Sequence, residues 1–186
     1  QCPELVTSDA FVCKALAASN SGDPNAAAGA FEQAAEAQAD SEAEKARLWA
    51  AAGNMWIAAN QPGKAAVALD KALASSELQA EQRGEALLDR ARAAEAQNDL
   101  KTARAKVGEA MQTIAADPFL WYFSAALAIR EGDAATAKSA IGKALSLEPN
   151  NPTILFEAGH VYHFADEESA ARTFWSRAAP DDADGK

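Results

Sequence analysis

The chain has 186 residues, of which 49% are hydrophobic and 24% charged, and its formal net charge is −10. This composition is typical of a folded domain or a short repeat array and argues against a disordered chain. The negative charge argues against nucleic acid or an anionic membrane surface as the main partner, because both would be repelled. No apolar run approaches the roughly 20 residues that cross a bilayer, so we expect no direct membrane insertion.

The two cysteines, Cys2 and Cys13, lie near the beginning of the sequence. On one continuous helix their Cα atoms would be about 16 Å apart, and a disulfide tolerates only about 7 Å. Thr7, Ser8 and Asp9 are favourable N-cap residues, so a helix that begins there lets residues 2–6 fold back and bring Cys2 to Cys13. We therefore expect a disulfide bond; the alternative is two reduced thiols, one of them buried in a helix.

A disulfide indicates an oxidising compartment, most simply a bacterial periplasm. The sequence begins Gln1-Cys2 without an initiator methionine, which fits either a processed export signal or a trimmed chain. We expect a periplasmic or otherwise exported protein, with a cytoplasmic location as the alternative.

Turn signals divide the sequence at similar intervals. Each is followed by an Ala-rich segment with apolar residues at helical spacing, such as Ala65, Leu69, Ala72 and Leu73. The pattern predicts an all-α chain of five helix pairs. The turn signals are Asn20-Ser21-Gly22-Asp23-Pro24, Asn60-Gln61-Pro62-Gly63, Asn98-Asp99, Glu131-Gly132-Asp133 and Ala165-Asp166.

The units between these turns begin near residues 8, 46, 84, 118 and 152, so that the earlier ones are spaced by 38 residues and the later ones by 34. A nearly fixed period predicts an α-solenoid. Ser76 and Gln79 fit a capping box that extends the third unit's first helix backwards into its extra residues, and Ser41 fits the same role in the second unit. We expect one array over residues 1–186, with hairpins at 8–41, 42–79, 80–117, 118–151 and 152–180 and an acidic tail at 181–186.

These units resemble tetratricopeptide repeats, whose pattern reads W-x2-L-G-x2-Y followed by A-x3-F, A and P. The second unit is the clearest match, with Trp49, Gly53 and Trp56 in its first helix and Ala65 and Leu69 in its second. The first and third units are degenerate, but the resemblance covers nearly the whole chain and implies a right-handed superhelix. The fourth and fifth units match at Trp121, Gly132, Ala137, Ile141, Ala144 and Pro149, and at Gly159, Tyr162, Ala171, Trp175 and Ala178.

Catalytic and metal-binding patterns are weak. The sequence has no Gly-rich phosphate loop, no nucleophile elbow and no paired cysteine ligands, and its two histidines are His160 and His163. Glu157 and His160 match half of a di-iron helix-bundle motif, which needs a second copy and two further glutamates. We therefore expect no enzymatic activity, no metal and no cofactor.

In tetratricopeptide repeats the first helix of each hairpin lines a concave groove, so the resemblance implies which side chains meet a ligand. It implies a polar middle zone, in which Arg47, Asn54 and Arg92 could hold a carboxylate, and an aromatic C-terminal zone. The alternative for the aromatic residues is packing inside the hairpins. Further groove residues of the first three hairpins are Val12, Leu16, Ala50, Ile57, Glu85, Leu88 and Glu95, and the C-terminal zone contains Phe119, Tyr122, Arg130, Phe156, His160, His163 and Phe164.

We expect a non-enzymatic scaffold that binds a protein or a peptide in this groove. One alternative is a structural subunit that self-associates through its termini. Another is an accessory domain of a larger envelope assembly or enzyme. Some tetratricopeptide repeats clamp a C-terminal carboxylate with a fixed set of Lys and Asn, and that set is not reproduced here.

Overall fold

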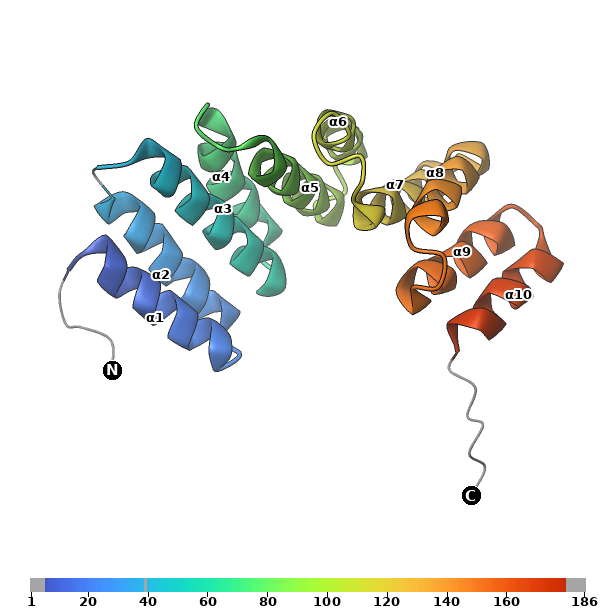
Figure 1. Cartoon of the computed structure of the whole chain (residues 1–186), viewed down its shortest axis with the longest axis horizontal. Coiled ribbons are helices and arrows are strands. Elements are labelled where there is room, and N and C mark those ends of the chain that lie inside the picture. Colours follow the sequence, from blue (N-terminus) through green and yellow to red (C-terminus); the bar gives the residue numbers. More distant parts are fainter. Residues whose placement is uncertain (1–5, 39, 180–186) are drawn as a thin grey trace, which may run out of the picture. The chain divides into compact units, whose positions relative to one another are not determined.

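The computed structural model describes residues 6–38 and 40–179, and this part of the chain forms ten α-helices and no strand (Figure 1). Consecutive helices pair into five hairpins, one in each of the expected ranges, so the predicted all-α repeat is confirmed. The helices are α1 (Ser8–Asn20), α2 (Pro24–Ala37), α3 (Glu42–Ala58), α4 (Pro62–Ala74), α5 (Ala80–Ala96), α6 (Leu100–Ala110), α7 (Pro118–Glu131), α8 (Ala134–Leu147), α9 (Pro152–Phe164) and α10 (Glu168–Ala178).

The chain divides into two compact units, Gln1–Thr113 with α1 to α6 and Ile114–Lys186 with α7 to α10. A single superhelix over all five hairpins stays a prediction. Cys13 is half-buried in α1, whereas Cys2 lies outside the described residues, so the disulfide also stays a prediction. The acidic tail at 181–186 lies outside the described residues as well.

One residue with left-handed backbone conformation closes the turn of every hairpin. Glycine, asparagine and aspartate adopt this conformation at the lowest cost. The residue that follows donates its N–H to the carbonyl five residues earlier, as Asp23 does to Ala18 and Asp99 to Ala94, both at 2.9 Å. The left-handed residues are Gly22, Asn60, Asn98, Gly132 and Asp166, with φ angles of 77°, 55°, 60°, 79° and 59°.

Aspartates cap three of the second helices. Asp23, Asp99 and Asp133 each accept a hydrogen bond at 3.0 Å from the backbone N–H three residues later. This satisfies a donor that has no partner within the helix. Hydrogen bonds from the side chain and the backbone of Thr102 hold the pKa of Asp99 below its ordinary value.

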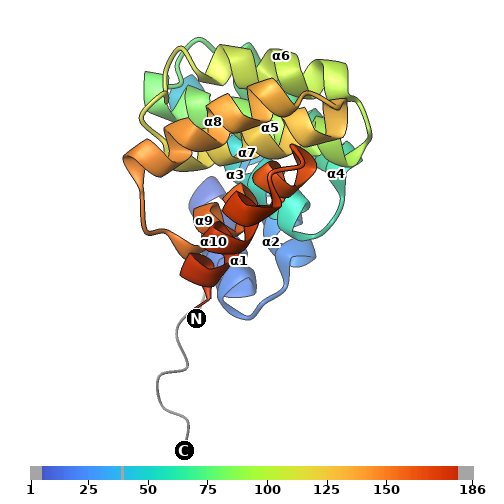
Figure 2. The ribbon, with the colours of Figure 1, turned by 90° about the vertical axis from the view of Figure 1, so that its right-hand side faces the viewer.

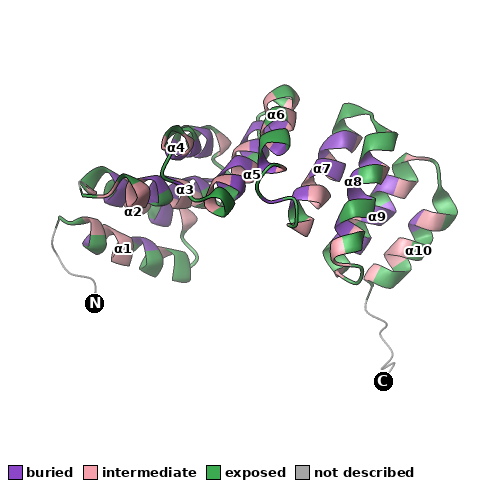
Figure 3. Ribbon diagram, turned by 45° about the horizontal axis from the view of Figure 1, so that its top comes forward, coloured by how far each residue is buried: buried purple, intermediate pink, exposed green. Residues whose placement is uncertain are grey.

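Small residues let the two helices of each hairpin lie close together. In the first helices, Gly53 and Gly159 leave no space for a side chain: a Cβ atom on Gly53 would lie 2.4 Å from Cγ of Leu69. Figure 3 shows the buried residues on the sides of the helices that face one another, with exposed residues at the turns. One equivalent alanine of each second helix is fully buried: Ala27, Ala65, Ala103, Ala137 and Ala171, each 0% exposed.

Two tryptophans anchor the core of the first unit. Trp49 and Trp56 are each only 6% exposed. Trp56 donates a hydrogen bond from Nε1 to Oε1 of Glu32 at 2.9 Å. The ammonium groups of Lys71 and Lys64 lie over the rings of Trp49 and Trp56, at 3.6 and 4.2 Å from the ring centroids. These lysines therefore shield the edges of the core by cation–π contact.

The second and third hairpins are four residues longer than the others, and the extra residues lengthen the first helix of each. Helices α3 and α5 have 17 residues, whereas α1, α7 and α9 have 13 or 14. Ser41 caps α3 as predicted, accepting a hydrogen bond from the N–H of Glu44 at 3.2 Å. The predicted capping box from Ser76 to Gln79 is wrong: α5 begins after Gln79, whose N–H bonds to the side chain of Gln82 at 3.3 Å. Leu78, in the loop before α5, is 6% exposed and belongs to the core of the first unit.

Candidate functional site: a cavity lined by three first helices

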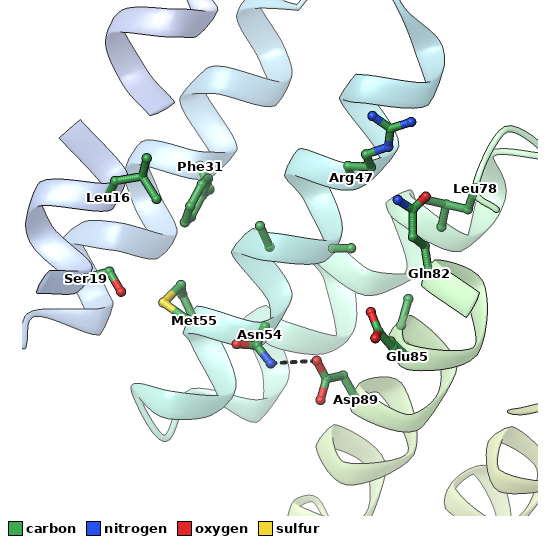
Figure 4. Close-up of a pocket in the computed structure, with 13 residues that line it drawn as sticks. Leu16, Ser19, Phe31, Arg47, Asn54, Met55, Leu78, Gln82, Glu85 and Asp89 are labelled. Atoms are coloured by element: carbon green, nitrogen blue, oxygen red, sulfur yellow. Dashed lines mark hydrogen bonds between the residues drawn. The ribbon is translucent and has the colours of Figure 1, made fainter. Parts of the chain in front are cut away.

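A cavity of about 480 Å³ opens on the first unit (Figure 4). Helices α1, α3 and α5, the first helices of three successive hairpins, all line it. Phe31 of α2 and Leu78 of the loop before α5 complete its lining. Several predicted groove residues therefore meet in one place: Leu16, Arg47, Ala50, Asn54 and Glu85.

One side of the cavity is apolar. Leu16 of α1 is 53% exposed, although leucine is usually buried, and it lies beside the half-buried Phe31 and Met55 (Figure 4). Ala50 and Ala51 of α3 have small side chains, which leave space between the apolar wall of the cavity and helix α5. An apolar side chain of a ligand would be removed from water here.

The other side is polar and is organised by Asp89 of α5. Its carboxylate accepts a hydrogen bond from Nδ2 of Asn54 at 2.8 Å and another from Nη1 of Arg92 at 3.1 Å. The bond to Asn54 joins α5 to α3 across the cavity (Figure 4). Asp89 thus connects two residues of the predicted polar zone, although sequence reasoning did not include Asp89 itself.

Both arginines of the predicted polar zone are paired with carboxylates of this chain. Arg47 donates from Nη1 to Oε2 of Glu44 at 3.0 Å, and Arg92 is paired with Asp89. Arg92 does not line the cavity, whereas Gln82, Glu85 and Asp89 do. The charged groups that line the cavity are therefore two carboxylates and one guanidinium. This composition argues against a carboxylate as the ligand's main polar group.

The predicted aromatic residues lie at two places on the second unit. On α7, the rings of Phe119 and Tyr122 meet edge to face with centroids 6.3 Å apart, and Phe119 is 45% exposed. Arg130 is exposed in the last turn of the same helix. On α9, Phe156 is 56% exposed and packs edge-on against His160, with centroids 4.7 Å apart. Phe164, 38% exposed, ends α9.

Trp175 of α10 contacts several aromatic side chains of the last hairpin. Figure 2 shows the ribbon of this hairpin with α10 towards the reader. Its ring centroid lies 5.5 Å from that of His160 and 5.9 Å from that of His163. Its Nε1 donates to the backbone carbonyl of Phe156 at 3.1 Å. His163 also contacts Glu168 through Nδ1. Sequence reasoning placed Trp175 in the repeat pattern but not in the site.

A second cavity, of about 450 Å³, lies beside Trp175 and Phe156. In the preceding hairpin, Ile141 and Ala144 occupy the positions of Trp175 and Ala178. Both are fully buried in a cluster that includes Ile154 of α9. Trp175 and Ala178 are only half-buried. The last hairpin therefore presents a partly apolar surface; its cavity is lined by Pro152, Thr153, Phe156, Trp175, Ala178 and Ala179.

Within residues 6–38 and 40–179, no group of three or more His, Cys, Asp and Glu side chains is placed to hold a metal ion. Glu157, the acidic member of the weak di-iron motif, is half-buried, and burial raises its pKa. In the part of the chain that the structure describes, no helix has the length and apolar character needed to span a bilayer.

No family model matches the sequence, and no curated protein is significantly similar to it. Several solved structures share its fold. MamA from Desulfovibrio magneticus RS-1 has a TM-score of 0.74 at 14% identity, over 92% of this chain and 92% of that chain. PilW, a widely conserved type IV pilus biogenesis factor, has a TM-score of 0.76 at 18% identity, over 90% of this chain and 74% of that chain.

YrrB, a TPR protein with an unusual peptide-binding site, has a TM-score of 0.66 at 17% identity, over 92% of this chain and 84% of that chain. Identities this low establish the fold and not the binding partner. The repeat positions, the hairpin turns and these neighbours agree. The chain has the fold of the tetratricopeptide-repeat proteins.

Proposed function

We propose that this chain is a non-enzymatic scaffold that binds a peptide or a segment of another protein in the cavity of the first unit. The observation that carries this proposal is the convergence of α1, α3 and α5 on one cavity with an apolar side and a hydrogen-bonding side. Ligand sites commonly combine apolar walls with a few convergent polar groups, at volumes of about 300–1,000 Å³. The peptide-binding site of YrrB, a neighbour in fold, supports the same class of function.

The pull-down that tests this proposal uses a substitution that fills the cavity. Ala50 lies in the cavity wall and is half-buried, so Ala50→Phe places a ring in the space for a ligand without changing the charge. Ala105→Phe, on the exposed face of α6, is the matched control. Lysate of the source organism would be passed over each variant, and captured proteins identified by cross-linking mass spectrometry.

We expect the wild type and Ala105→Phe to capture the same partner, and Ala50→Phe to lose it. Circular dichroism and the melting temperature establish that Ala50→Phe is folded. If a folded Ala50→Phe protein retains every partner of the wild type, the cavity is not the binding site.

Self-association is a second candidate function, and the surface around Phe156 and Trp175 favours it. Exposed aromatic residues beside an open cavity commonly mark contact surfaces. Static light scattering at high micromolar concentration would compare the wild type with Phe156→Ser and with Phe119→Ser, a control on another exposed phenylalanine of the same unit. An oligomer that only Phe156→Ser dissociates would support this candidate, whereas a monomeric wild type would exclude it.

A further inference from the structure

The fourth hairpin shows how a second helix of the second unit is covered by the hairpin that follows. Helix α9 packs on α8, where Ile141 and Ala144 are fully buried in one cluster with Ile154 and Val161 of α9. Tyr122 of α7 packs against the same cluster. The first helix of the last hairpin therefore closes the surface that α7 and α8 form together.

The last hairpin leaves the same surface open. The counterparts of the three residues of α7 and α8 just named, each 34 positions later, are Phe156, Trp175 and Ala178, which we call the open face. Phe156 is 56% exposed, the other two are half-buried, and all three line the cavity of about 450 Å³. In the described part of the chain no helix follows α10, and residues 180–186 contain no large apolar side chain. Apolar side chains that cover the open face therefore come from elsewhere.

An ion pair between α8 and the last hairpin shows where a covering helix places a negative charge. Lys138 of α8 pairs with Glu167, which lies three residues after the end of α9. Arg172, 34 positions after Lys138, is exposed, and within the described residues it makes no hydrogen bond or ion pair. A helix that covered α10 as α9 covers α8 would bring its counterpart of Glu167 to Arg172. The expected partner of Arg172 thus belongs to the covering helix.

We propose that the open face binds an amphipathic helix of another protein, which packs on α10 as α9 packs on α8 and carries an acidic residue in the turn after its end. Helix α9 shows the required pattern: large apolar residues at the positions of Ile154 and Val161, with a small residue, Ala158, between them. Residues at this spacing lie on one side of a helix. The inference goes beyond the function proposed for the cavity of the first unit and does not depend on it.

Charge favours a different protein over a second copy as the occupant. In a two-fold contact α10 would face α10, so that Arg172 and Arg177 of both copies would share one interface and repel each other. In a head-to-tail contact the covering helix would be α1. Its Lys14 is the counterpart of Ala158, because each precedes the left-handed residue of its turn by eight positions. This contact would place a further cation beside the arginines, so the inference is the alternative to the self-association considered above.

The first step of the test measures binding of a synthetic peptide to the full chain by fluorescence anisotropy. The peptide has the sequence of residues 150–167, which includes the packing face of α9 and Glu167. A hydrocarbon staple on its other side holds the helix, because short helices are marginal in water. Phe156→Ser in the protein should weaken binding about tenfold, because an apolar contact is lost. Phe119→Ser, at another exposed phenylalanine of the same unit, is the control and should change binding less than about twofold.

The second step exchanges the charges of the proposed ion pair. Arg172→Glu in the protein should weaken binding about three- to fivefold, as expected for an exposed pair, and Glu167→Lys in the peptide should restore it. The control Lys101→Glu, on the exposed face of α6, changes the net charge equally and should alter binding of either peptide less than about twofold. A peptide that displaced α9 from α8 would pair with Lys138 instead, so the exchange identifies the surface that is bound.

Three results would overturn the inference. The first is the absence of saturable binding to the wild type by a peptide that circular dichroism shows to be helical. The second is an equal effect of Arg172→Glu and Lys101→Glu, without restoration by Glu167→Lys. The third is a wild-type oligomer in static light scattering that Phe156→Ser dissociates, because a second copy then occupies the open face. None of these results bears on the cavity of the first unit, which Ala50→Phe tests separately.

Discussion

Gly159 and Trp175 are packed so closely that no side chain fits at position 159: a Cβ atom there would lie 2.1 Å from Nε1 of the indole ring. Gly53 and Leu69 have the same relationship in the second hairpin, at the same separation of 16 residues in the sequence. The glycine of the first helix and the large residue of the second are therefore coupled, and one cannot change without the other.

Gly159→Ala should destabilise the protein by about 1–3 kcal/mol, because the added methyl group displaces the ring of Trp175 and breaks its hydrogen bond to Phe156. The measurement is urea unfolding followed by circular dichroism. Gly142→Ala, in α8 of the same unit, is the control: nothing lies within 4 Å of its added Cβ atom. It should stabilise by about 0.5–1 kcal/mol, because alanine is favoured over glycine within a helix. Equal effects of the two substitutions would contradict the packing argument.

Trp49→Ala should cost more stability than Trp121→Ala. Trp49 is 6% exposed in the core of the first unit, and its loss should cost about 3–5 kcal/mol. Trp121 is half-buried, and its indole N–H bonds to the carbonyl of Ala115 at 2.8 Å. Since less apolar surface is buried, we expect a loss of about 1–3 kcal/mol there. Urea unfolding of both variants checks the order, and a larger cost at Trp121 would be inconsistent with these burial differences.

Glu157→Gln should raise the melting temperature at neutral pH. Burial raises the pKa of Glu157, and the nearby His160 opposes this shift only in part. The folded protein therefore binds this proton more tightly than the unfolded chain, and stability is lost as the pH rises from the ordinary pKa through the raised one. The gain from glutamine should accordingly disappear below a pH of about 4.5, the ordinary value.

Differential scanning calorimetry across this pH range measures the effect, with the exposed Glu36→Gln as the control. A gain at Glu157→Gln that persists unchanged in acid would show that side-chain shape, and not ionisation, is responsible.

Asn60→Ala should destabilise the second hairpin by about 1 kcal/mol, because φ at this residue is 55° and alanine disfavours the left-handed region. Asn60→Gly should cost nothing for the same reason. Asn25→Ala lies in the first turn of α2, has ordinary helical geometry, and serves as the control. Thermal unfolding of the three variants distinguishes a backbone effect from a side-chain effect: if Asn60→Gly is as unstable as Asn60→Ala, the asparagine side chain itself is needed.

The sequence was sufficient to predict the fold because each hairpin turn carries its own local signal. Gly22 and Gly132 are glycines in turn sequences, and Asn60 and Asn98 are the residues that best replace glycine there. The fully buried alanines recur at the same place in each unit. The turn residues and the buried alanines therefore indicate the same helix boundaries. Both can be recognised in the sequence without knowing which distant residues are in contact.

The site was predictable only where it follows the repeat. Leu16, Arg47, Ala50, Asn54 and Glu85 occupy groove positions that the resemblance implies, and all five line the cavity. Asp89 was missed because its importance comes from hydrogen bonds to Asn54 of another helix and to Arg92, and no spacing in the sequence reveals such pairing.

Leu78 and Gln82 were missed for a different reason. Gln82 lies in the extra turn at the start of α5, for which a 34-residue repeat template has no counterpart, and Leu78 lies in the loop directly before that turn. The departure from the regular period was visible, and it marks the segment that completes the cavity wall.

Packing and the cavity wall overlap at Leu78, which is 6% exposed in the core of the first unit and also lines the cavity. Ala65 and Leu69 pack inside the hairpin, whereas Gln82, in the extra turn at the start of α5, is half-buried and lines the cavity. A related protein that changes only position 82 would alter what this cavity accepts while keeping the contacts that hold the hairpins together. Position 82 is therefore a place where evolution, or a protein engineer, can change specificity at little cost to stability.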